Sequence, residues 1–514
     1  MGISNKITLK TGINKVTKGL YPGEAAIDCF AGGGGFSTGM EMAGLKPAVA
    51  INHDLSAIEM HKQNHPNTIH YCEDIWGVNP TDVLNELKRI GYKSIGYLHA
   101  SPDCTHFSVA KGGKPVEKKI RGLSWVVINW ALKTNMRTFS LENVKEIESW
   151  GPLVEDANGK MKPDPERYGE TFKGFIKILS TGLKPSHPAF KEMYHALKLE
   201  FNYDIKEKLR LVKGLGYDIK YRVFNACDFG AGTTRPRLFM IARNDGLPLE
   251  FPAITHGESE GLKPLVPAAN FINWNLPSKS IFNRKKPLAD ATLKRVFKGL
   301  EREVLENDDP FIVDSEMTVP FITECANASN QRNIKVTRPL PTITAYPKGG
   351  SFALVDAKLK KIDDDLTASY LIKFRNGGIS QSLKEPLHTI TSGGNHYGLI
   401  TAYLISYYGN GKSHSLKKPL NTITTKDRYA VVIVKGNKYI IEDIRLRMLD
   451  PEELYGCQGF PSDYKFKYNP DGSKRTKSDQ VKKCGNSVSP IAGAAIASAL
   501  VTKFDDAIAL PLAS

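Results

Sequence analysis

The sequence predicts an α/β protein with a doubly wound, mostly parallel sheet and an inserted β-rich domain. Between residues 25 and about 245, short β-rich runs such as 48–51 and 238–241 alternate with helical stretches such as 57–64. That alternation is typical of a mostly parallel sheet covered by helices on both faces. After about residue 250 the content of Pro, Gly, Asn, Ser and Thr increases, which favours turns and strands over helices.

The region after residue 250 contains an internal repeat. The pattern Pro-Leu-x-Thr-Ile-Thr occurs at 339–344, 386–391 and 419–424. Because the copies are unequally spaced, we expect a compact module of three β-hairpins and not a solenoid. An Ala-rich helix is predicted at 490–500, and its small residues should let it pack back on the first sheet. The expected domains are 1–250, 251–440 and 441–514.

Composition narrows the class of protein. The chain has 514 residues, 41% of them hydrophobic, with no run of 18 apolar residues and no secretory signal, so we expect no membrane segment. Its seven cysteines are dispersed without a Cys-x-x-Cys pair, which argues against a zinc ribbon or a disulfide framework and favours a reduced compartment. The net charge of +16 favours a polyanionic partner such as nucleic acid, although a basic surface that binds nothing would look the same.

A glycine-rich loop follows the first predicted strand. Residues 28–36 read DCFAGGGGF and lead from a strand into a helix. Glycines let a backbone turn sharply and approach a ligand closely, and a helix N-terminus favours electronegative groups. The loop predicts a cofactor site, but a dinucleotide site or a plain tight turn would have the same glycines.

Cys104 is the candidate nucleophile. It lies in PDCTHFS, residues 102–108, just after the apolar run 95–98. A thiolate at a strand-to-loop junction is accessible for attack, whereas a buried structural cysteine is the alternative. Glu142 follows another β-rich run, 138–141, at the sheet edge where ligands bind.

These pieces, in this order and with Arg235 and Arg237 behind them, resemble the DNA (cytosine-5) methyltransferases. The resemblance covers roughly residues 24–250 and 443–495. It implies the class I S-adenosylmethionine-dependent methyltransferase fold, with 1–250 as catalytic and cofactor-binding domain. Residues 251–440, which the resemblance does not cover, are by their position the expected target-recognition domain, and 441–514 are expected to be part of the catalytic domain again.

The resemblance implies a cofactor pocket for S-adenosylmethionine. Phe30 would lie against the cofactor, His53 would stack near the adenine, and Asp74 would accept from the adenine amino group. Asn52 stands where the family usually has a glutamate for the ribose hydroxyls. The full set of expected cofactor residues is Asp28, Phe30, Gly32, Gly34, Gly35, Asn52, His53, Asp74, Ile75, Asn486 and Val488.

The resemblance also implies the catalytic residues Cys104, Glu142, Arg235 and Arg237. Cys104 would add to C6 of a flipped-out cytosine, Glu142 would act at N3, and the arginines would contact the base oxygen and order the site. Asn143 would brace the loop. Asp103, Thr105 and Thr233 depart from the family's usual proline, glutamine and glutamine.

A basic, glycine-containing segment follows the nucleophile. We expect it to close over DNA phosphates, although a solvated charge run is the alternative. The expected DNA-binding residues are Ser108, Lys111, Lys114, Lys118, Lys119 and Arg121.

The expected partner is duplex DNA, with a cognate restriction endonuclease as a further possible partner. We expect a monomer in the cytoplasm of a prokaryote or phage-infected cell. A metal site is rejected, because His61, His65, His70 and Cys72 lack the glutamate of a known zinc pattern. Two alternatives remain open: a tRNA cytosine-5 methyltransferase and a catalytically inactive DNA-binding relative.

Overall fold

The computed structural model describes most of the chain. The described residues are 17–103, 122–155, 161–198, 203–282, 284–307, 309–313, 315, 317–325, 333–345, 352–361, 369–373, 380–382, 397–401, 431–434 and 437–504. They form two compact units: Met1–Val266 with Pro341–Ala345 and Leu454–Ser514, and Pro267–Leu340 with Tyr346–Glu453. We call them the first and the second unit. Among the helices of the described residues, none is long and apolar enough to cross a membrane.

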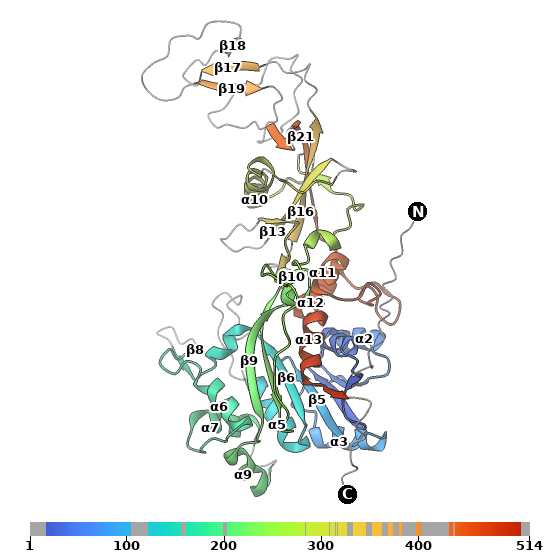
Figure 1. The fold of residues 1–514 in the computed structure, drawn as a ribbon, viewed down its shortest axis with the longest axis vertical. Coiled ribbons are helices and arrows are strands. Elements are labelled where there is room, and N and C mark those ends of the chain that lie inside the picture. Colours follow the sequence, from blue (N-terminus) through green and yellow to red (C-terminus); the bar gives the residue numbers. More distant parts are fainter. Residues whose placement is uncertain are drawn as a thin grey trace. The chain divides into compact units, whose positions relative to one another are not determined.

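The first unit is built on a seven-stranded sheet (Figure 1). Its order is β4-β3-β2-β5-β6-β11-β9. The pairs from β4 to β6 are parallel, whereas β11 is antiparallel to both β6 and β9. The strands are β2 (Glu24–Cys29), β3 (Pro47–Ile51), β4 (Ile69–Tyr71), β5 (Ser94–Ala100), β6 (Thr138–Asn143), β9 (Asp218–Asn225) and β11 (Pro236–Arg243). The predicted doubly wound, mostly parallel sheet is therefore confirmed.

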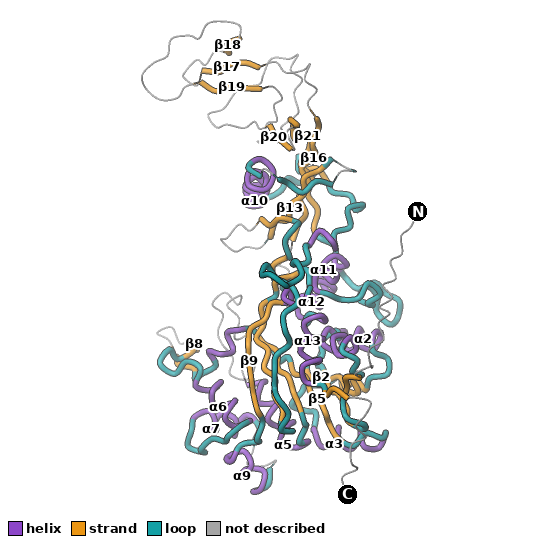
Figure 2. The backbone as a smooth tube through the Cα atoms, in the orientation of Figure 1, coloured by secondary structure: helices purple, strands orange, loops and turns teal. Residues whose placement is uncertain are grey.

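Helices cover both faces of this sheet and are drawn purple in Figure 2. One hydrophobic core joins the sheet to α3 (Pro80–Arg89), α5 (Trp125–Thr134), α6 (Glu170–Leu179) and α7 (Pro188–Ala196). The other joins it to α1 (Gly35–Met42) and α13 (Pro490–Leu500), through residues such as Phe36 and Ile496. The predicted return of the 490–500 helix to the first sheet is confirmed.

Local sequence fixes where several helices begin. Asp54 caps α2 (Leu55–Asn64) by accepting from the backbone N–H groups of Ser56 and Ala57. Asp204 and Glu207 form a reciprocal capping box at the start of α9 (Ile205–Lys213). Such caps satisfy N–H groups that have no partner within the helix. Further elements of the first unit are β1 (Thr17–Gly19), β22 (Thr502–Phe504), β7 (Leu153–Glu155), β8 (Met161–Pro163), β10 (Thr233–Thr234), α11 (Pro451–Gln458) and α12 (Lys477–Asn486).

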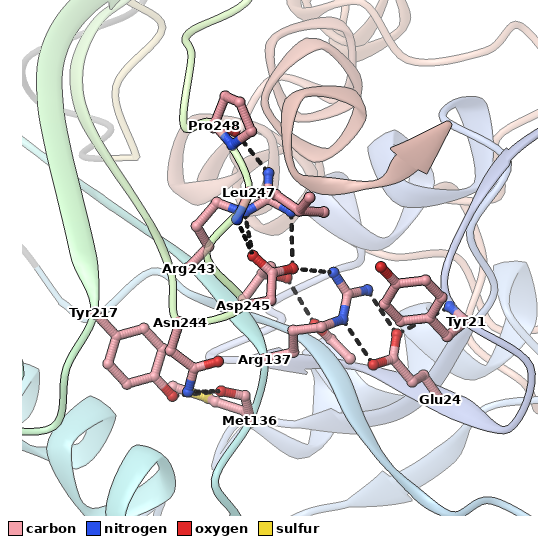
Figure 3. A network of polar contacts seen from close by, with 12 residues as sticks. Tyr21, Glu24, Met136, Arg137, Tyr217, Arg243, Asn244, Asp245, Leu247 and Pro248 are labelled. Atoms are coloured by element: carbon pink, nitrogen blue, oxygen red, sulfur yellow. Dashed lines mark hydrogen bonds and ion pairs between the residues drawn. The ribbon is translucent and has the colours of Figure 1, made fainter. Parts of the chain in front are cut away.

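The amino-terminal edge of the sheet is closed by a network of charged side chains (Figure 3). Arg137 donates to both carboxyl oxygens of Glu24, at 2.7 and 2.6 Å, and to Asp245 Oδ2 at 3.0 Å. Arg243 donates to both oxygens of Asp245, at 2.6 and 2.8 Å. Burial works against the ionised Asp245, but the bonds from Arg243 and Arg137 outweigh it and lower its pKa to about 2. Side chains from strands far apart in the chain are thereby tied together.

The second unit contains an antiparallel sheet in the order β12-β21-β16-β13-β14, with β20 also paired to β21. The strands are β12 (Lys279–Ser280), β13 (Thr318–Glu324), β14 (Asn333–Lys335), β16 (Phe352–Lys361), β20 (Val431–Val434) and β21 (Asn437–Met448). Helix α10 (Asp290–Leu300) packs on this sheet through Val296 and Leu300. A separate three-stranded sheet contains β17 (Ser369–Lys373), β18 (Ser380–Ser382) and β19 (Tyr397–Thr401).

The first copy of the repeat does not form a hairpin of its own. Leu340–Pro341, strand β15, pairs with β10, and Thr233 Oγ1 donates to the Pro341 carbonyl at 3.1 Å. Residues 341–345 thus belong to the first unit. This corrects the prediction for 339–344, because a long-range strand pairing replaces the local one. The copies at 386–391 and 419–424 lie outside the described residues. The compact units divide at 266/267 and 453/454, where the sequence suggested 250 and 440.

Candidate active site

The expected site residues follow the ends of successive parallel strands. Phe30 comes after β2, Asn52 after β3 and Asp74 after β4, while Glu142 lies near the end of β6. Carboxyl ends of parallel strands meet at one edge of a sheet, and β2 has β3 on one side and β5 on the other. Ligands of doubly wound sheets bind at such a switch point. Tertiary structure therefore brings these residues to a common edge.

The glycine loop turns at this edge through left-handed conformations. Phe30, Gly32 and Gly34 have φ values of 64°, 53° and 103°. A side chain on Gly34 would meet His65 Nε2 at 2.9 Å, and one on Gly35 would meet Ser487 Oγ at 1.9 Å. A Cβ on Gly32 would approach only the Phe30 carbonyl, at 4.0 Å, among the described residues. Gly34 and Gly35 thus make room for the protein itself, whereas Gly32 lies on the open side of the loop.

Asp28 lies behind the loop and is fully buried. Its Oδ2 accepts from Ser37 Oγ at 2.8 Å, and Oδ1 has no hydrogen-bond partner among the described residues. Burial raises the pKa of this carboxyl to about 7, against the hydrogen bond from Ser37. Asp28 has no exposed surface among the described residues and accepts from Ser37 behind the loop; its place among the cofactor residues stays a prediction.

The residues after β3 and β4 differ in how much they are exposed. Asn52 Oδ1 accepts from the backbone N–H of Asp54 at 2.8 Å, so its side chain shapes the turn into α2. His53 is exposed, and so is Asp74, whose Oδ1 accepts from the Trp76 N–H at 3.0 Å. Ile75 is buried. His53 and Asp74 are therefore the side chains of this group that are available to a ligand.

The segment 486–488 returns to the glycine loop. Val488 is buried in the core with Phe36, and its carbonyl lies 2.3 Å from the position that a Cβ on Gly35 would occupy. Asn486 is exposed at the end of α12. Gln458 is fully buried and donates to the carbonyls of Cys484 and Ser487. It fixes the chain that carries Asn486.

The loop that leads to the candidate nucleophile is anchored on two sides. Asn143 Nδ2 donates to the Pro102 carbonyl at 3.2 Å, as the predicted bracing role requires. Ser101 Oγ donates to the Phe30 carbonyl at 3.3 Å, which ties this loop to the glycine loop. Cys104 and the predicted DNA-binding residues lie outside the described residues: Ser108, Lys111, Lys114, Lys118, Lys119 and Arg121.

Glu142 and Arg237 form the charged centre of this edge. Glu142 is 6% exposed, and its Oε1 lies 3.0 Å from Arg237 Nε. The contact is an ion pair without hydrogen-bond geometry, since Oε1 has no hydrogen-bond partner among the described residues. Because the carboxyl is incompletely bonded, it keeps the capacity to bond a ligand.

Arg235 has a different environment from Arg237. It is 5% exposed, and its Nη1 donates to the carbonyls of Ile343 and Gly485, at 3.1 and 2.9 Å. The sequence grouped the two arginines as contacts to the base, and for Arg235 this contact stays a prediction beside the observed bonds to the two carbonyls. Its guanidinium holds together segments 108 and 250 residues away in the chain.

Sequence reasoning did not identify the histidines behind the glycine loop as part of a hydrogen-bonded network. His61 Nδ1 lies 2.8 Å from His70 Nε2, and His61 Nε2 lies 2.9 Å from Ser37 Oγ. His65 Nδ1 pairs with Glu41 Oε1 at 2.8 Å. The clustering of histidines was visible in the sequence, where it was considered only as a metal site. Among the described residues no group of three side chains is arranged to hold a metal ion.

Comparison with known proteins agrees with this geometry. The family model for "C-5 cytosine-specific DNA methylase" matches residues 25–151 and 195–502. The chain is 24% identical to the type II methyltransferase M.AquIA of Picosynechococcus, over 45% of this chain and 77% of that protein. It is 25% identical to M1.HphI of Haemophilus parahaemolyticus and 26% to M.DdeI of Desulfomicrobium norvegicum. Those alignments span 45% of this chain and 49% and 43% of the two relatives.

The match extends over more than half of the chain and includes the glycine loop, Glu142, Arg237 and the segment around Asn486. The chain therefore belongs to the C-5 cytosine-specific DNA methylase family and is a DNA cytosine methyltransferase.

Proposed function

We propose that this enzyme transfers a methyl group from S-adenosylmethionine to C5 of a cytosine flipped out of duplex DNA, through a covalent bond between Cys104 and C6. The observation that supports this most is the Glu142–Arg237 pair at the carboxyl edge of the sheet. Asn143, next to Glu142, is bonded to Pro102, two residues before Cys104. A carboxyl, an arginine and the approach to a thiol are thus held at one edge.

The residues of the loop fit the proposed cofactor. Among the described residues a Cβ on Gly32 would approach only the Phe30 carbonyl, and Asp74 presents an exposed carboxylate at the same edge. Asp74 is suited to accept hydrogen bonds from an adenine amino group, and His53 to contact the ring. When bound, S-adenosylmethionine supplies an electrophilic methyl group.

Catalysis then needs an activated cytosine. Attack of the Cys104 thiolate forms the S–C6 bond, and Glu142 hydrogen bonds or protonates N3, so that the electron pair of C5–C6 becomes available at C5. Arg237, which pairs with Glu142, is the residue proposed to contact the base oxygen. After methylation, loss of the C5 proton and departure of the thiolate restore the ring.

The second unit is the proposed target-recognition domain, predicted at 251–440 and compact over Pro267–Glu453 without 341–345. Its support is that the first unit is interrupted between Val266 and Leu454 to accommodate it, together with the net charge of +16. We propose duplex DNA as substrate, a cytoplasmic location and a monomer. A cognate restriction endonuclease is the proposed biological partner, since the relatives are named as type II methyltransferases.

The test is covalent trapping. The target site is first mapped by sequencing 5-methylcytosine in DNA from cells that express the chain. Duplex DNA with 5-fluorocytosine at that site cannot lose a C5 proton, so enzyme and DNA should remain joined after denaturation, with the bond on the peptide that contains Cys104.

Two controls give the trap its meaning. Cys104→Ser should form no adduct, because a hydroxyl is much less nucleophilic than a thiolate, whereas Cys72→Ser, at an exposed cysteine, should form it normally. Absence of an adduct on verified target DNA would refute Cys104 as nucleophile. Trapping by fluorinated tRNA in place of DNA would support the tRNA alternative.

A further inference from the structure

Four polar side chains form a continuous chain behind the glycine loop. Ser37 Oγ lies 2.8 Å from Asp28 Oδ2, His61 Nε2 lies 2.9 Å from Ser37 Oγ, and His70 Nε2 lies 2.8 Å from His61 Nδ1. The four residues come from β2, α1, α2 and β4. Sequence reasoning treated the two histidines only as rejected metal ligands.

The exposure of these side chains differs between the two ends of the hydrogen-bonded series. Asp28, Ser37 and His61 have no exposed surface, whereas His70 is partly exposed. A fully buried carboxyl therefore connects to solvent through a hydroxyl and two imidazoles. Each of these groups can both donate and accept a hydrogen bond.

The chain of bonds has two self-consistent arrangements. In one, Asp28 is ionised and accepts from Ser37 Oγ–H. His61 Nε2–H then donates to Ser37 Oγ, and His70 Nε2–H donates to His61 Nδ1. In the other, Asp28 carries a proton and donates to Ser37, Ser37 donates to His61 Nε2, and His61 Nδ1–H donates to His70 Nε2. Moving one proton along the chain converts one arrangement into the other without moving heavy atoms.

The surroundings favour the arrangement with the proton on Asp28. Burial raises the pKa of the Asp28 carboxyl to about 7, well above its usual value, although the hydrogen bond from Ser37 opposes this change. Burial, with smaller effects from neighbouring charges, lowers the pKa of His70 to about 4 and that of His61 well below its usual value. Both imidazoles are thus neutral at neutral pH, which this arrangement requires.

We propose that the Asp28–Ser37–His61–His70 chain is a proton path, and that Asp28 is a positioning residue of the glycine loop that loses its proton when the cofactor binds. The proposal rests on the proposed cofactor. S-adenosylmethionine carries a positive sulfonium, and a positive charge near the loop favours an ionised carboxyl. The Asp28 proton passes to Ser37 Oγ, the Ser37 proton to His61 Nε2, the Nδ1 proton of His61 to His70 Nε2, and the Nδ1 proton of His70 to solvent.

Other groups around Asp28 do not supply this proton. The titratable and charged groups that face it are Cys29 on β2, Glu41 on α1, His61 and His65 on α2, Tyr97 and His99 on β5, and Tyr464. Burial raises the pKa values of Cys29, Tyr97 and Tyr464 and lowers that of His99, so all four stay neutral. His65 is paired with Glu41.

The first experiment measures protons released at equilibrium. Calorimetric titration of the full chain with S-adenosylmethionine at pH 7, in two buffers of different ionisation enthalpy, gives the protons released per bound cofactor. We expect release with wild type and less release with S-adenosylhomocysteine, which lacks the sulfonium charge. Asp28→Asn should bind cofactor with the release abolished, while His195→Gln, at an exposed histidine of α7, should behave as wild type.

The second experiment tests the path. A pH-indicator dye in stopped flow should report proton release in step with cofactor binding in wild type. His61→Leu interrupts the chain and should delay the release, and Ser37→Ala is the smaller substitution to use if that variant does not fold.

The outcomes separate this inference from the proposed function. Cofactor binding without proton release, equal release from Asp28→Asn, or equally fast release from the interrupted variants would each overturn the inference while the proposed function stands. Failure of wild type to bind S-adenosylmethionine at all would overturn both.

Discussion

The two edges of the sheet in the first unit use buried charge in opposite ways. At the amino-terminal edge, Arg137 lies between Glu24 and Asp245 and donates hydrogen bonds to both carboxylates (Figure 3). At the carboxyl edge, Glu142 has an ion pair with Arg237, but its Oε1 lacks a hydrogen-bond partner among the described residues. Asp28 Oδ1 is likewise unbonded there.

This difference separates stability from function. A charge network that satisfies its own members has little capacity left for a ligand, and removing one member is costly. An edge with incompletely bonded buried groups is less stable than it could be and is ready to bind something else. We therefore expect substitutions at the two edges to change different measurements.

The largest effect is expected for Glu142→Gln. The amide keeps the shape but neither donates a carboxyl proton nor pairs with Arg237, so methyl transfer to DNA should slow by roughly 10²–10⁴-fold in single-turnover assays. Unfolding midpoints should change little. Glu146→Gln, a few residues further in the same segment, is the matched control and should transfer at the wild-type rate; equal rates for both variants would remove Glu142 from catalysis.

Arg137→Met should act on stability instead. Glu24 would lose its arginine partner and Asp245 one of its two, and because both carboxylates are partly shielded from water the free energy of unfolding should fall by about 1.5–3 kcal/mol. The measurement is urea denaturation, together with the transfer rate of the folded fraction, which should be unchanged. Lys220→Met breaks the exposed pair with Glu250 and should cost under about 1 kcal/mol. A similar loss of stability in both variants would mean that the Arg137 network stabilises the fold no more than an exposed ion pair does.

The same network predicts a pH dependence of stability. The pKa of Asp245 is about 2 in the folded protein, against an ordinary value of about 3.9. The ionised Asp245 therefore contributes stability that is fully present above about pH 4 and is lost as the pH falls through 2. Asp245→Asn should flatten the acid side of the stability curve, measured by denaturation between these limits; an unchanged slope would contradict the assignment.

The smallest effect is expected for Asp74→Ala. Because the side chain is exposed, the fold should be unaffected, while loss of a hydrogen bond to the cofactor should weaken binding by roughly 1–2 kcal/mol. Calorimetry with S-adenosylmethionine measures this change. Asp82→Ala, at the exposed start of α3, is the control, and unchanged affinity in Asp74→Ala would exclude Asp74 from the pocket.

Much of the fold was predictable because its signals are local. Helix 57–64 appears as α2, run 48–51 as β3 and run 238–241 within β11. Their periodicity and flanking residues act over a few positions, which is why sequence alone locates them. The order of the motifs along the chain also predicted which residues follow the strand ends.

The sequence by itself determined the α/β alternation, the order of the motifs and the candidacy of Cys104, Glu142 and Arg237. Only the tertiary structure decided that Arg235 bonds to the Ile343 and Gly485 carbonyls and that Asp28 is buried behind the glycine loop. Only the tertiary structure likewise decided that residues 341–345, which the sequence placed in the repeat module, belong to the first unit. The physical reason is that these roles depend on partners many positions away, and local pattern carries no information about which distant carbonyl or strand will be within bonding distance.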